Sequence, residues 1–310
     1  MFTQNFEIAA TFNIAAPSGL TVRGYAERSP FVPKIDPDYV FQKEVLRDVL
    51  CWLEEPHGDG LYLSGPTGCG KSSLICQVAG RLNIPVQPVS AHSRLEIVEL
   101  VGHLTLVNGT MSFADGPITT AMRHGHLLLI DELDLLEPAT AVGLNSIVEG
   151  RPLLIPQTGE LIVPHEDFRI AATGNTAGAG DTTGLYQGTL RQNLAFMDRF
   201  RLVQVSYPEP AIEQSILSRT ASVIDNGIRE KMIAVANEIR RLFMGESNDA
   251  AAIEITMSTR SLVRWAHLAL AFKGAPLSYS MGRALTFRAQ PETREAVLQI
   301  VQRHFGSSSV

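Results

Sequence analysis

Cysteine is scarce in this sequence, and several other features are absent. The 310 residues include three cysteines, Cys51, Cys69 and Cys76. An odd number without metal-site spacing argues against a disulfide framework or a zinc site and favours a reducing compartment. No run of about eighteen apolar residues is present to cross a membrane. The first residues include Glu7 and no basic stretch before the apolar positions, unlike a secretory signal. We therefore expect a soluble cytoplasmic protein.

A long basic run is also absent. The formal net charge is −6, from 32 Asp and Glu against 26 Lys and Arg. Because neutralising nucleic-acid phosphates requires clustered Lys and Arg, this balance argues against a dedicated nucleic-acid surface. The sequence does contain 45% hydrophobic and 19% charged residues, the composition of a globular protein with a sizeable core. Its length suits about two domains, at roughly 150 residues each.

The segment SGPTGCGKSS, residues 64–73, carries the strongest motif. It follows an apolar run and precedes a helical pattern, which is the context of a phosphate-binding loop. Its glycines permit conformations in which consecutive N–H groups surround an anion. Lys71 is expected to reach the β and γ phosphates of ATP, and Ser72 to ligate Mg²⁺. The nucleotide-binding candidates here are Gly65, Pro66, Thr67, Gly68, Cys69 (a small filler), Gly70, Lys71, Ser72 and Ser73.

Apolar strands alternate with helical patterns around and after this loop. The strands are expected within residues 61–64, 85–90, 126–131, 169–175 and 201–208. Runs that are apolar on both faces, separated by helices, are typical of a parallel sheet covered on both sides. An amphipathic helix is expected over residues 39–55, before the first strand. We therefore predict a doubly covered α/β domain over residues 35–208.

The two ends of the chain differ from this core. Residues 1–34 are predicted to be a strand-rich leader. Prolines separate this leader from the core. From Pro210 the periodicity is helical, so we predict a smaller α-helical domain over residues 209–305. Residues 306–310 are expected to be a frayed tail. The helices of the second domain are expected at 211–224, 229–243, 259–272 and 291–305.

Two predicted β-hairpins interrupt the α/β pattern. Asn108 and Gly109 lie between apolar alternations, which is the strongest short-range signal for a two-residue hairpin turn. Gly159 lies in a second turn between two apolar strands. One hairpin precedes the strand at 126–131, and the other precedes the strand at 169–175. Both are expected to project from the core, either as surface decoration or as functional elements.

Acidic and amide side chains follow two of the predicted strands. Asp131 ends an apolar strand and is expected to contact the nucleotide and its Mg²⁺, because ligands bind at the carboxyl edge of open α/β sheets. Glu132 is the candidate for polarising the attacking water. Asn175 could orient the same water, or it could be a turn residue. Asp134 is interpreted as a solvated acid at a helix start.

Arginines near the last predicted strand are further candidates. Arg199, within MDRF, could form a structural ion pair with a neighbouring acid. It could instead reach the γ phosphate of a neighbouring subunit, where a planar cation offsets the charge that develops during transfer. Arg201 is the alternative residue for this second role.

The helix expected from residue 259 begins with STR. Ser258 and Thr259 are cap candidates, and Arg260 lies in the first turn. A cation at this end of a helix is disfavoured by the helix dipole unless it has an anionic partner. A γ phosphate between the two domains would be such a partner, and Arg264 competes with Arg260 for this role.

The order of motifs along the chain resembles that of the AAA+ ATPases. The motifs are the phosphate loop, IDE, GNT, MDRF, STR and the closing helical domain. The two hairpins resemble the helix-2 insert and the pre-sensor-1 hairpin of the MoxR branch. Residues 180–200 are similar to the ATPase subunit of aerobic cobaltochelatase and to activators of Rubisco and nitric oxide reductase. This resemblance covers about residues 35–275. It implies an α/β fold: an AAA+ P-loop NTPase core with a parallel sheet, two inserted β-hairpins and a small C-terminal α-helical domain.

The resemblance also implies a function. Such proteins form homo-hexameric rings and hydrolyse ATP at subunit interfaces, which implies that Arg199 is an arginine finger. They commonly work with a protein that carries a von Willebrand factor A domain, and they remodel a partner or drive metal insertion. The alternatives are a cobaltochelatase ATPase subunit, a nucleic-acid motor and a nucleotide-gated scaffold. The phosphate loop differs from the cobaltochelatase form at variable positions. The presence of Glu132 and Asn175 argues against the scaffold. No membrane or nucleic-acid partner is expected.

Overall fold

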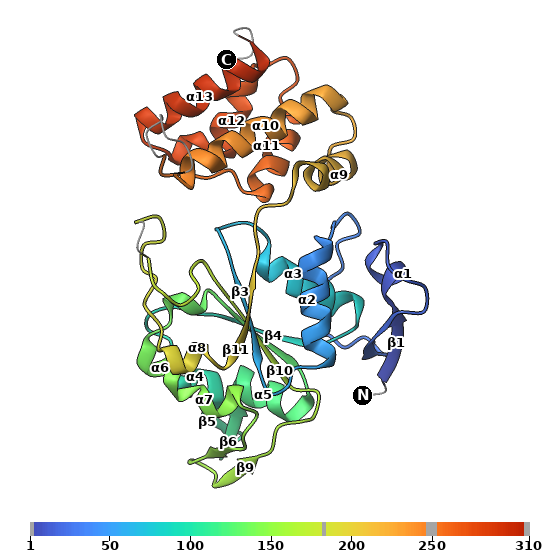
Figure 1. Cartoon of the computed structure of the whole chain (residues 1–310). Helices are drawn as coiled ribbons and strands as arrows, with labels where there is room; N and C mark the ends of the chain where they lie inside the picture. Colours follow the sequence, from blue (N-terminus) through green and yellow to red (C-terminus); the bar gives the residue numbers. More distant parts are fainter. Residues whose placement is uncertain (1–2, 182–183, 246–252, 307–310) are drawn as a thin grey trace. The chain divides into compact units, whose positions relative to one another are not determined.

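A five-stranded parallel sheet lies at the centre of the first of two compact units in the computed structural model (Figure 1). The structure describes residues 3–181, 184–245 and 253–306. The first unit includes the chain up to Pro37 together with residues 41–66 and 71–205, and the second includes 38–40, 67–70 and the chain from Ser206. In sheet order, the strands are β11 (Phe200–Gln204), β3 (Gly60–Ser64), β10 (Arg169–Gly174), β7 (Leu127–Asp131) and β4 (Val86–Ser90).

The parallel sheet is buried on both faces, as its continuous apolar strands predict. Leu61, Tyr62 and Leu63 of the central strand β3 are each 0% exposed. All neighbouring strands pair in parallel, so the prediction of a doubly covered α/β fold is confirmed. The helices of this unit include α2 (Lys43–Glu54), α3 (Lys71–Arg81), α4 (Ile97–Val101), η1 (Leu133–Leu135), α5 (Pro117–His124), α6 (Pro138–Gly143), α7 (Asn145–Val148) and α8 (Leu194–Met197).

Helix α2 begins later than its sequence pattern predicts. The expected start was near residue 39, but Gln42 has an extended backbone and helical structure begins at Lys43. Phe41 is buried and packs edge to face against Phe12, with ring centroids 5.2 Å apart. The apolar residues before Lys43 therefore pack as extended chain, which periodicity alone does not distinguish from a helix.

Both predicted hairpins are present. Strands β5 (Gly102–Val107) and β6 (Thr110–Asp115) flank Asn108 and Gly109, whose φ angles of 51° and 81° are the left-handed pair that a tight hairpin turn requires. Strands β8 (Leu153–Ile155) and β9 (Glu160–Ile162) form the second hairpin. Arg123, in the last turn of α5, joins the two hairpins: its Nε lies 2.9 Å from Asp115, and its terminal nitrogens donate to Glu160 at 2.5 and 2.7 Å.

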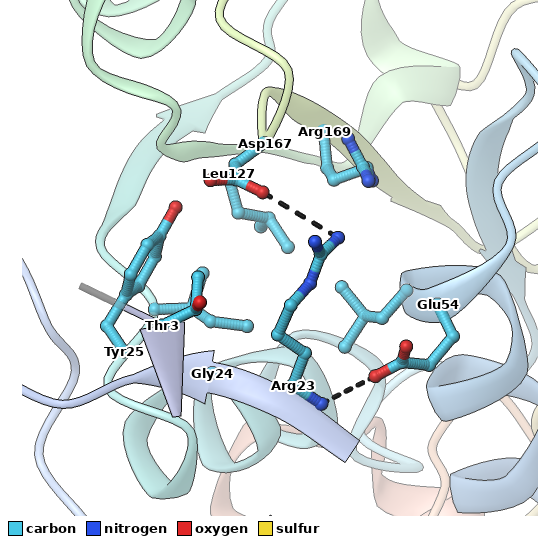
Figure 2. A pocket seen from close by; sticks show the side chains of 10 residues that line it. Thr3, Arg23, Gly24, Tyr25, Glu54, Leu127, Asp167 and Arg169 are labelled. Atoms are coloured by element: carbon cyan, nitrogen blue, oxygen red, sulfur yellow. Dashed lines mark hydrogen bonds and ion pairs between the residues drawn. The ribbon is translucent and has the colours of Figure 1, made fainter. Parts of the chain in front are cut away.

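The N-terminal leader is part of the first unit. Strands β1 (Thr3–Glu7) and β2 (Thr21–Tyr25) pair antiparallel around the short helix α1 (Ile8–Phe12). Figure 2 shows Arg23 extending from β2 between Glu54 and Asp167: its backbone N–H donates to Glu54 at 2.5 Å, and its guanidinium lies 3.8 Å from Asp167. The leader is therefore attached to α2 and to the chain entering β10.

The second unit is helical within the described residues. It contains α9 (Pro210–Thr220), α10 (Asn226–Phe243), α11 (Thr259–Ala271), α12 (Leu277–Ala284), η2 (Thr286–Arg288) and α13 (Pro291–Phe305). The sequence pattern predicted α9, α10, α11 and α13 but not α12. Apart from Gly306, the predicted tail lies outside the described residues. No helix among the residues with a described structure is both long and apolar enough to span a membrane.

A buried ion pair stabilises the second unit. Arg240 and Glu213 are 4% and 0% exposed, and two guanidinium nitrogens of Arg240 donate to the two carboxylate oxygens at 2.8 and 2.7 Å. The Nε of Arg240 donates to the carbonyl of Met257, and the hydroxyl of Thr259 donates to Glu213 at 3.0 Å. This network therefore ties α9 and α10 to the start of α11.

Candidate functional site

The carboxyl ends of three adjacent strands form the candidate site. Ser64 of β3 pairs in register with Gly174 of β10, which lies between β3 and β7, and β7 ends at Asp131. Because parallel strands end at one edge of the sheet, the segments that follow them converge there. The segments that follow the three strands are the phosphate loop, the acidic segment from Asp131 and the turn containing Asn175.

Glycine conformations and the position of Lys71 suit the phosphate loop to anion binding. Gly68 and Gly70 have φ angles of +74° and +99°, which residues with a Cβ rarely adopt. Lys71 is buried at the start of α3, and its Nζ donates to the carbonyls of Gly65 at 2.7 Å and Pro66 at 3.0 Å. The cation is thus held within the loop that would surround a phosphate.

A second contact joins the phosphate-loop segment to Asn175. The Nζ of Lys71 donates to Asn175 Oδ1 at 3.1 Å, and the N–H of Gly65 donates to the carbonyl of Gly174 at 3.3 Å. The start of α3 and the end of β10 are therefore in direct contact. An amide oxygen beside the lysine lies where it can orient a group approaching the same phosphate.

Ser72 and Asp131 present oxygen ligands at one point. The Ser72 hydroxyl donates to Asp131 Oδ1 at 2.5 Å, and the Thr173 hydroxyl donates to the same oxygen. Mg²⁺ takes oxygen ligands and is usually bound by one or two carboxylates together with waters and substrate phosphates. No group of three or more His, Cys, Asp or Glu side chains suited to a metal occurs among the described residues. The pair Ser72 and Asp131 therefore fits a Mg²⁺ that arrives with a nucleotide, and not a stand-alone metal centre.

Glu132 has a strained backbone and an altered acidity. Its φ and ψ are 58° and 43°, a left-handed conformation that is uncommon for a residue with a side chain and recurs at functional sites. Its N–H donates to the Thr173 hydroxyl at 3.1 Å, which links it to Asp131 through one side chain. Burial, and then the charges of Asp131 and Asp134, raise the pKa of Glu132, while the charge of Lys71 opposes this shift. A carboxylate with a raised pKa is a stronger base.

The interpretation of Asp134 as a solvated acid is wrong. Its side chain is 0% exposed, and its Oδ2 accepts hydrogen bonds from the N–H groups of Asn175 at 2.7 Å and Thr176 at 3.0 Å. The one-turn helix η1 directs Asp134 back under the end of β10 instead of toward solvent. Asp134 therefore fixes the backbone of the turn that carries Asn175.

Tyr62 supports the same turn. Its hydroxyl donates to the carbonyl of Thr176 at 2.8 Å, and burial raises the pKa of the phenol so that it stays protonated. Sequence reasoning assigned no role in the site to Tyr62, Thr173 or Asp134. A Thr within an apolar strand and an acid three residues after Asp131 were the available signals.

Arg199 forms an ion pair with Glu149, which is the first of the two roles expected for it. Its Nε and Nη2 lie 2.7 and 2.6 Å from Glu149 Oε1, and its Nη1 donates to the carbonyl of Ala195. Its side chain remains 28% exposed. Arg201 points elsewhere, since its guanidinium donates to the carbonyl of Glu55 at 3.0 Å. The ion pair leaves a second role open to Arg199, because a partly exposed guanidinium can exchange its carboxylate partner for another anion.

In the second unit, Ser258 is the N-cap of α11, as expected. Its hydroxyl oxygen accepts from the N–H of Ser261 at 3.0 Å, while the hydroxyl of Thr259 donates to Glu213. Arg260 and Arg264 are both exposed on α11. The capped first turn thus presents Arg260 at the surface, where a helix dipole favours an added anion.

Comparisons with known proteins match both parts of the chain. Residues 60–200 match the family model described as "AAA domain (dynein-related subfamily)", and residues 213–304 match "CbbQ/NirQ/NorQ C-terminal". The chain is 34% identical to the aerobic cobaltochelatase subunit CobS of Sinorhizobium sp, over 93% of this chain and 87% of that protein. It is 30% identical to the denitrification regulatory protein NirQ of Stutzerimonas stutzeri, over 81% of this chain and 86% of that protein. Protein NorQ of Paracoccus denitrificans is 29% identical, over 66% of this chain and 73% of that protein.

Proposed function

Because this chain belongs to the MoxR-type AAA+ ATPases, we propose that it hydrolyses ATP and uses the resulting conformational change to activate or remodel a partner protein or to drive metal insertion. One observation supports the proposal most strongly. Lys71, Ser72, Asp131 and Asn175 come from three separate strand ends, yet they are joined by hydrogen bonds of 3.1 Å (Lys71 to Asn175) and 2.5 Å (Ser72 to Asp131).

In this proposal, nucleotide binding uses the phosphate loop. Lys71 exchanges its carbonyl partners at Gly65 and Pro66 for phosphate oxygens, so its positive charge is already placed before ATP arrives. Ser72 and Asp131 would hold Mg²⁺, which neutralises phosphate charge when bound. Thr173 keeps Asp131 oriented because its hydroxyl donates a hydrogen bond to that carboxylate.

Glu132 then acts as the base that polarises water. Its raised pKa strengthens it as a proton acceptor, and the link through Thr173 fixes it relative to Asp131. Asn175 orients the same water, since its amide lies beside Lys71 and its backbone is held by Asp134. Lys71→Ala should lose ATP binding, whereas Glu132→Gln should keep binding and lose turnover by about 100-fold or more. Equal ATPase rates for Glu132→Gln and the parent would remove Glu132 from this role.

Hydrolysis in trans is the second part of the proposal. We expect a homo-hexameric ring in which Arg199 of one subunit contacts the γ phosphate of its neighbour, while Arg260, or Arg264 in its place, contacts the phosphate from the second unit. Mixing Arg199→Ala with Lys71→Ala should restore part of the activity, because some interfaces then combine an intact phosphate loop with an intact arginine. If Arg199 serves its own subunit, the mixture stays inactive.

Output to a partner forms the third part. The hairpin around Asn108 and Gly109 exposes Leu106 and Met111, which are 67% and 58% exposed and lie opposite each other across the hairpin. We infer that this surface contacts a partner with a von Willebrand factor A domain. Replacing residues 105–112 with a Gly-Ser linker should preserve folding and basal ATPase but abolish stimulation by that partner. A variant that still responds fully would move the output elsewhere, with the hairpin around Gly159 as the next candidate.

The similarity to CobS favours a second candidate, the ATPase subunit of a cobaltochelatase. The two candidates share the ATPase site and differ in the client. ATP-dependent cobalt chelation, measured with the remaining chelatase subunits present, would establish the second candidate. Stimulation by the partner without any cobalt insertion would leave protein remodelling as the function.

A further inference from the structure

One carboxylate holds two arginines at the surface of the first unit. Glu149 Oε1 receives the Nε and Nη2 of Arg199 at 2.7 and 2.6 Å, and Glu149 Oε2 lies 2.7 Å from the Nε of Arg151. Arg199 lies fifty residues away in sequence, just before β11, whereas Arg151 follows Glu149 by two residues. The two guanidinium groups are therefore placed on opposite oxygens of a single side chain.

The backbone around Arg151 is fixed although its side chain is exposed. The N–H of Arg151 donates to the carbonyl of Ser146 at 2.8 Å, and Gly150 turns the chain there with a φ of +68°. Pro152 follows and restricts Arg151 to extended conformations. The Arg151 side chain is 70% exposed, and within the part of the chain that the structure describes its terminal nitrogens make no hydrogen bond or ion pair. A fixed backbone thus presents free guanidinium donors to solvent.

The charges of this group do not balance within the subunit. Two guanidinium groups face one carboxylate, which leaves an excess of one positive charge. Arg151 is 70% exposed, and an ion pair of such a side chain contributes about 0–1 kcal/mol, so stability gives little reason for adding Arg151 to the pair of Glu149 and Arg199. Two planar cations side by side instead match an anion with several oxygens, such as a phosphate group.

We propose that Arg151 is a second cation that contacts the γ phosphate of the neighbouring subunit, and that Glu149 is the positioning residue that holds Arg151 beside Arg199. This inference rests on the trans role proposed for Arg199. Glu149 keeps the two cations together against their mutual repulsion while no phosphate is present. At the interface, Arg151 and Arg199 together offset the charge that develops on the transferred phosphoryl group.

The test compares Arg151→Ala, Arg151→Lys and Glu149→Gln with a matched control, Arg47→Ala. Arg47 lies on α2 with a 76% exposed side chain. Arg151→Ala should lower kcat by about 10- to 100-fold, a fraction of the effect of a complete arginine finger, while KM for ATP changes little because the phosphate loop is intact. Arg151→Lys should retain part of kcat because it keeps the charge. Glu149→Gln should lower kcat in the same way, and Arg47→Ala should match the parent.

Mixing experiments assign the side of the interface. Arg151→Ala and Glu149→Gln should each regain activity when mixed with Lys71→Ala, but Arg151→Ala mixed with Arg199→Ala should not, because every interface then lacks one arginine. Suppose that Arg199→Ala complements Lys71→Ala, but Arg151→Ala either has the kinetics of the Arg47→Ala control or fails to complement Lys71→Ala. In that case this inference is overturned, and the trans role of Arg199 stands. If Arg199→Ala itself fails to complement, both proposals fall. Melting curves verify that each variant is folded.

Discussion

Removing the buried carboxylate of Asp134 should damage turnover more than nucleotide binding. In Asp134→Ala, the N–H groups of Asn175 and Thr176 lose the oxygen that they contact at 2.7 and 3.0 Å. Asp134 contacts neither Lys71 nor the phosphate loop, so ATP affinity should change little. Asn175 would lose the support of its backbone, and a displacement of about 1 Å at a catalytic group can lower kcat by about 100-fold.

The cost in stability follows from the same contacts. A hydrogen bond to a charged group contributes about 1.5–3 kcal/mol, so two such bonds set an upper value of about 3–6 kcal/mol. Removing the carboxylate also relieves its desolvation and its repulsion with Glu132, which lowers the net loss to about 2–4 kcal/mol. For a unit of this size, such a loss lowers the melting temperature by about 5–15 °C. Asp134→Asn keeps one acceptor oxygen and should show smaller effects on both quantities.

The assay combines melting curves, ATP titration and steady-state ATPase. Asp48→Ala is the matched control, because Asp48 lies on α2 with a 47% exposed side chain, and its carboxylate lies 3.9 Å from Arg47. All comparisons are made at a temperature where the variants are folded. A folded Asp134→Ala protein that has the kcat of Asp48→Ala, or that loses ATP binding and turnover equally, would contradict this role of Asp134.

Glu132→Gln should raise the melting temperature at pH 7 but have little effect on it below about pH 4. Burial raises the pKa of Glu132 in the folded protein. The ionised carboxylate therefore destabilises the fold only at a pH above the pKa of an ordinary Glu side chain, about 4.3. Melting curves between pH 4 and 8 that run parallel for parent and variant would contradict this. Glu213→Ala should cost the second unit about 3–5 kcal/mol in a urea titration, because it leaves Arg240 buried without its partner. Glu238→Ala removes a more exposed acid that is paired with Arg303, and it should cost about 0–1 kcal/mol in the same titration. Arg123→Ala should increase hydrogen exchange by about fivefold in β6 and β9, because the surface contacts of Arg123 join the two hairpins. Exchange that changes in only one hairpin would show that Arg123 does not couple them.

Local motifs explain why much of the fold could be predicted. Each strand of the parallel sheet is a short apolar run with turn residues after it, and the spacing of the phosphate loop specifies both its position and its conformation. The turn at Asn108 and Gly109 was predictable because its backbone requires left-handed residues. Helix α12 was not predicted, because its eight residues are too few for a clear helical period, although Gly274 and Pro276 mark the boundary before it.

Contacts between distant segments explain what the sequence did not reveal at the site. Asp134 has the sequence context of a helix-start acid, and its burial depends on how η1 turns beneath the end of β10, forty-one residues later. Glu149 carries no motif, and its significance arises only when Arg199 is brought to it across fifty residues. Residue types and local spacing therefore predict which groups could react, whereas tertiary packing decides which groups hold them in place.

The nucleotide retained by the Glu132→Gln variant tests the central claim most directly. The variant is mixed with ATP and Mg²⁺, free nucleotide is removed, and the bound nucleotide is identified over time beside that of the parent. We predict that Glu132→Gln retains intact ATP while the parent converts its bound ATP to ADP and phosphate, because Lys71 and Asp131 still bind nucleotide but no carboxylate polarises the attacking water. Bound ADP that forms in the variant as fast as in the parent would contradict the proposed site.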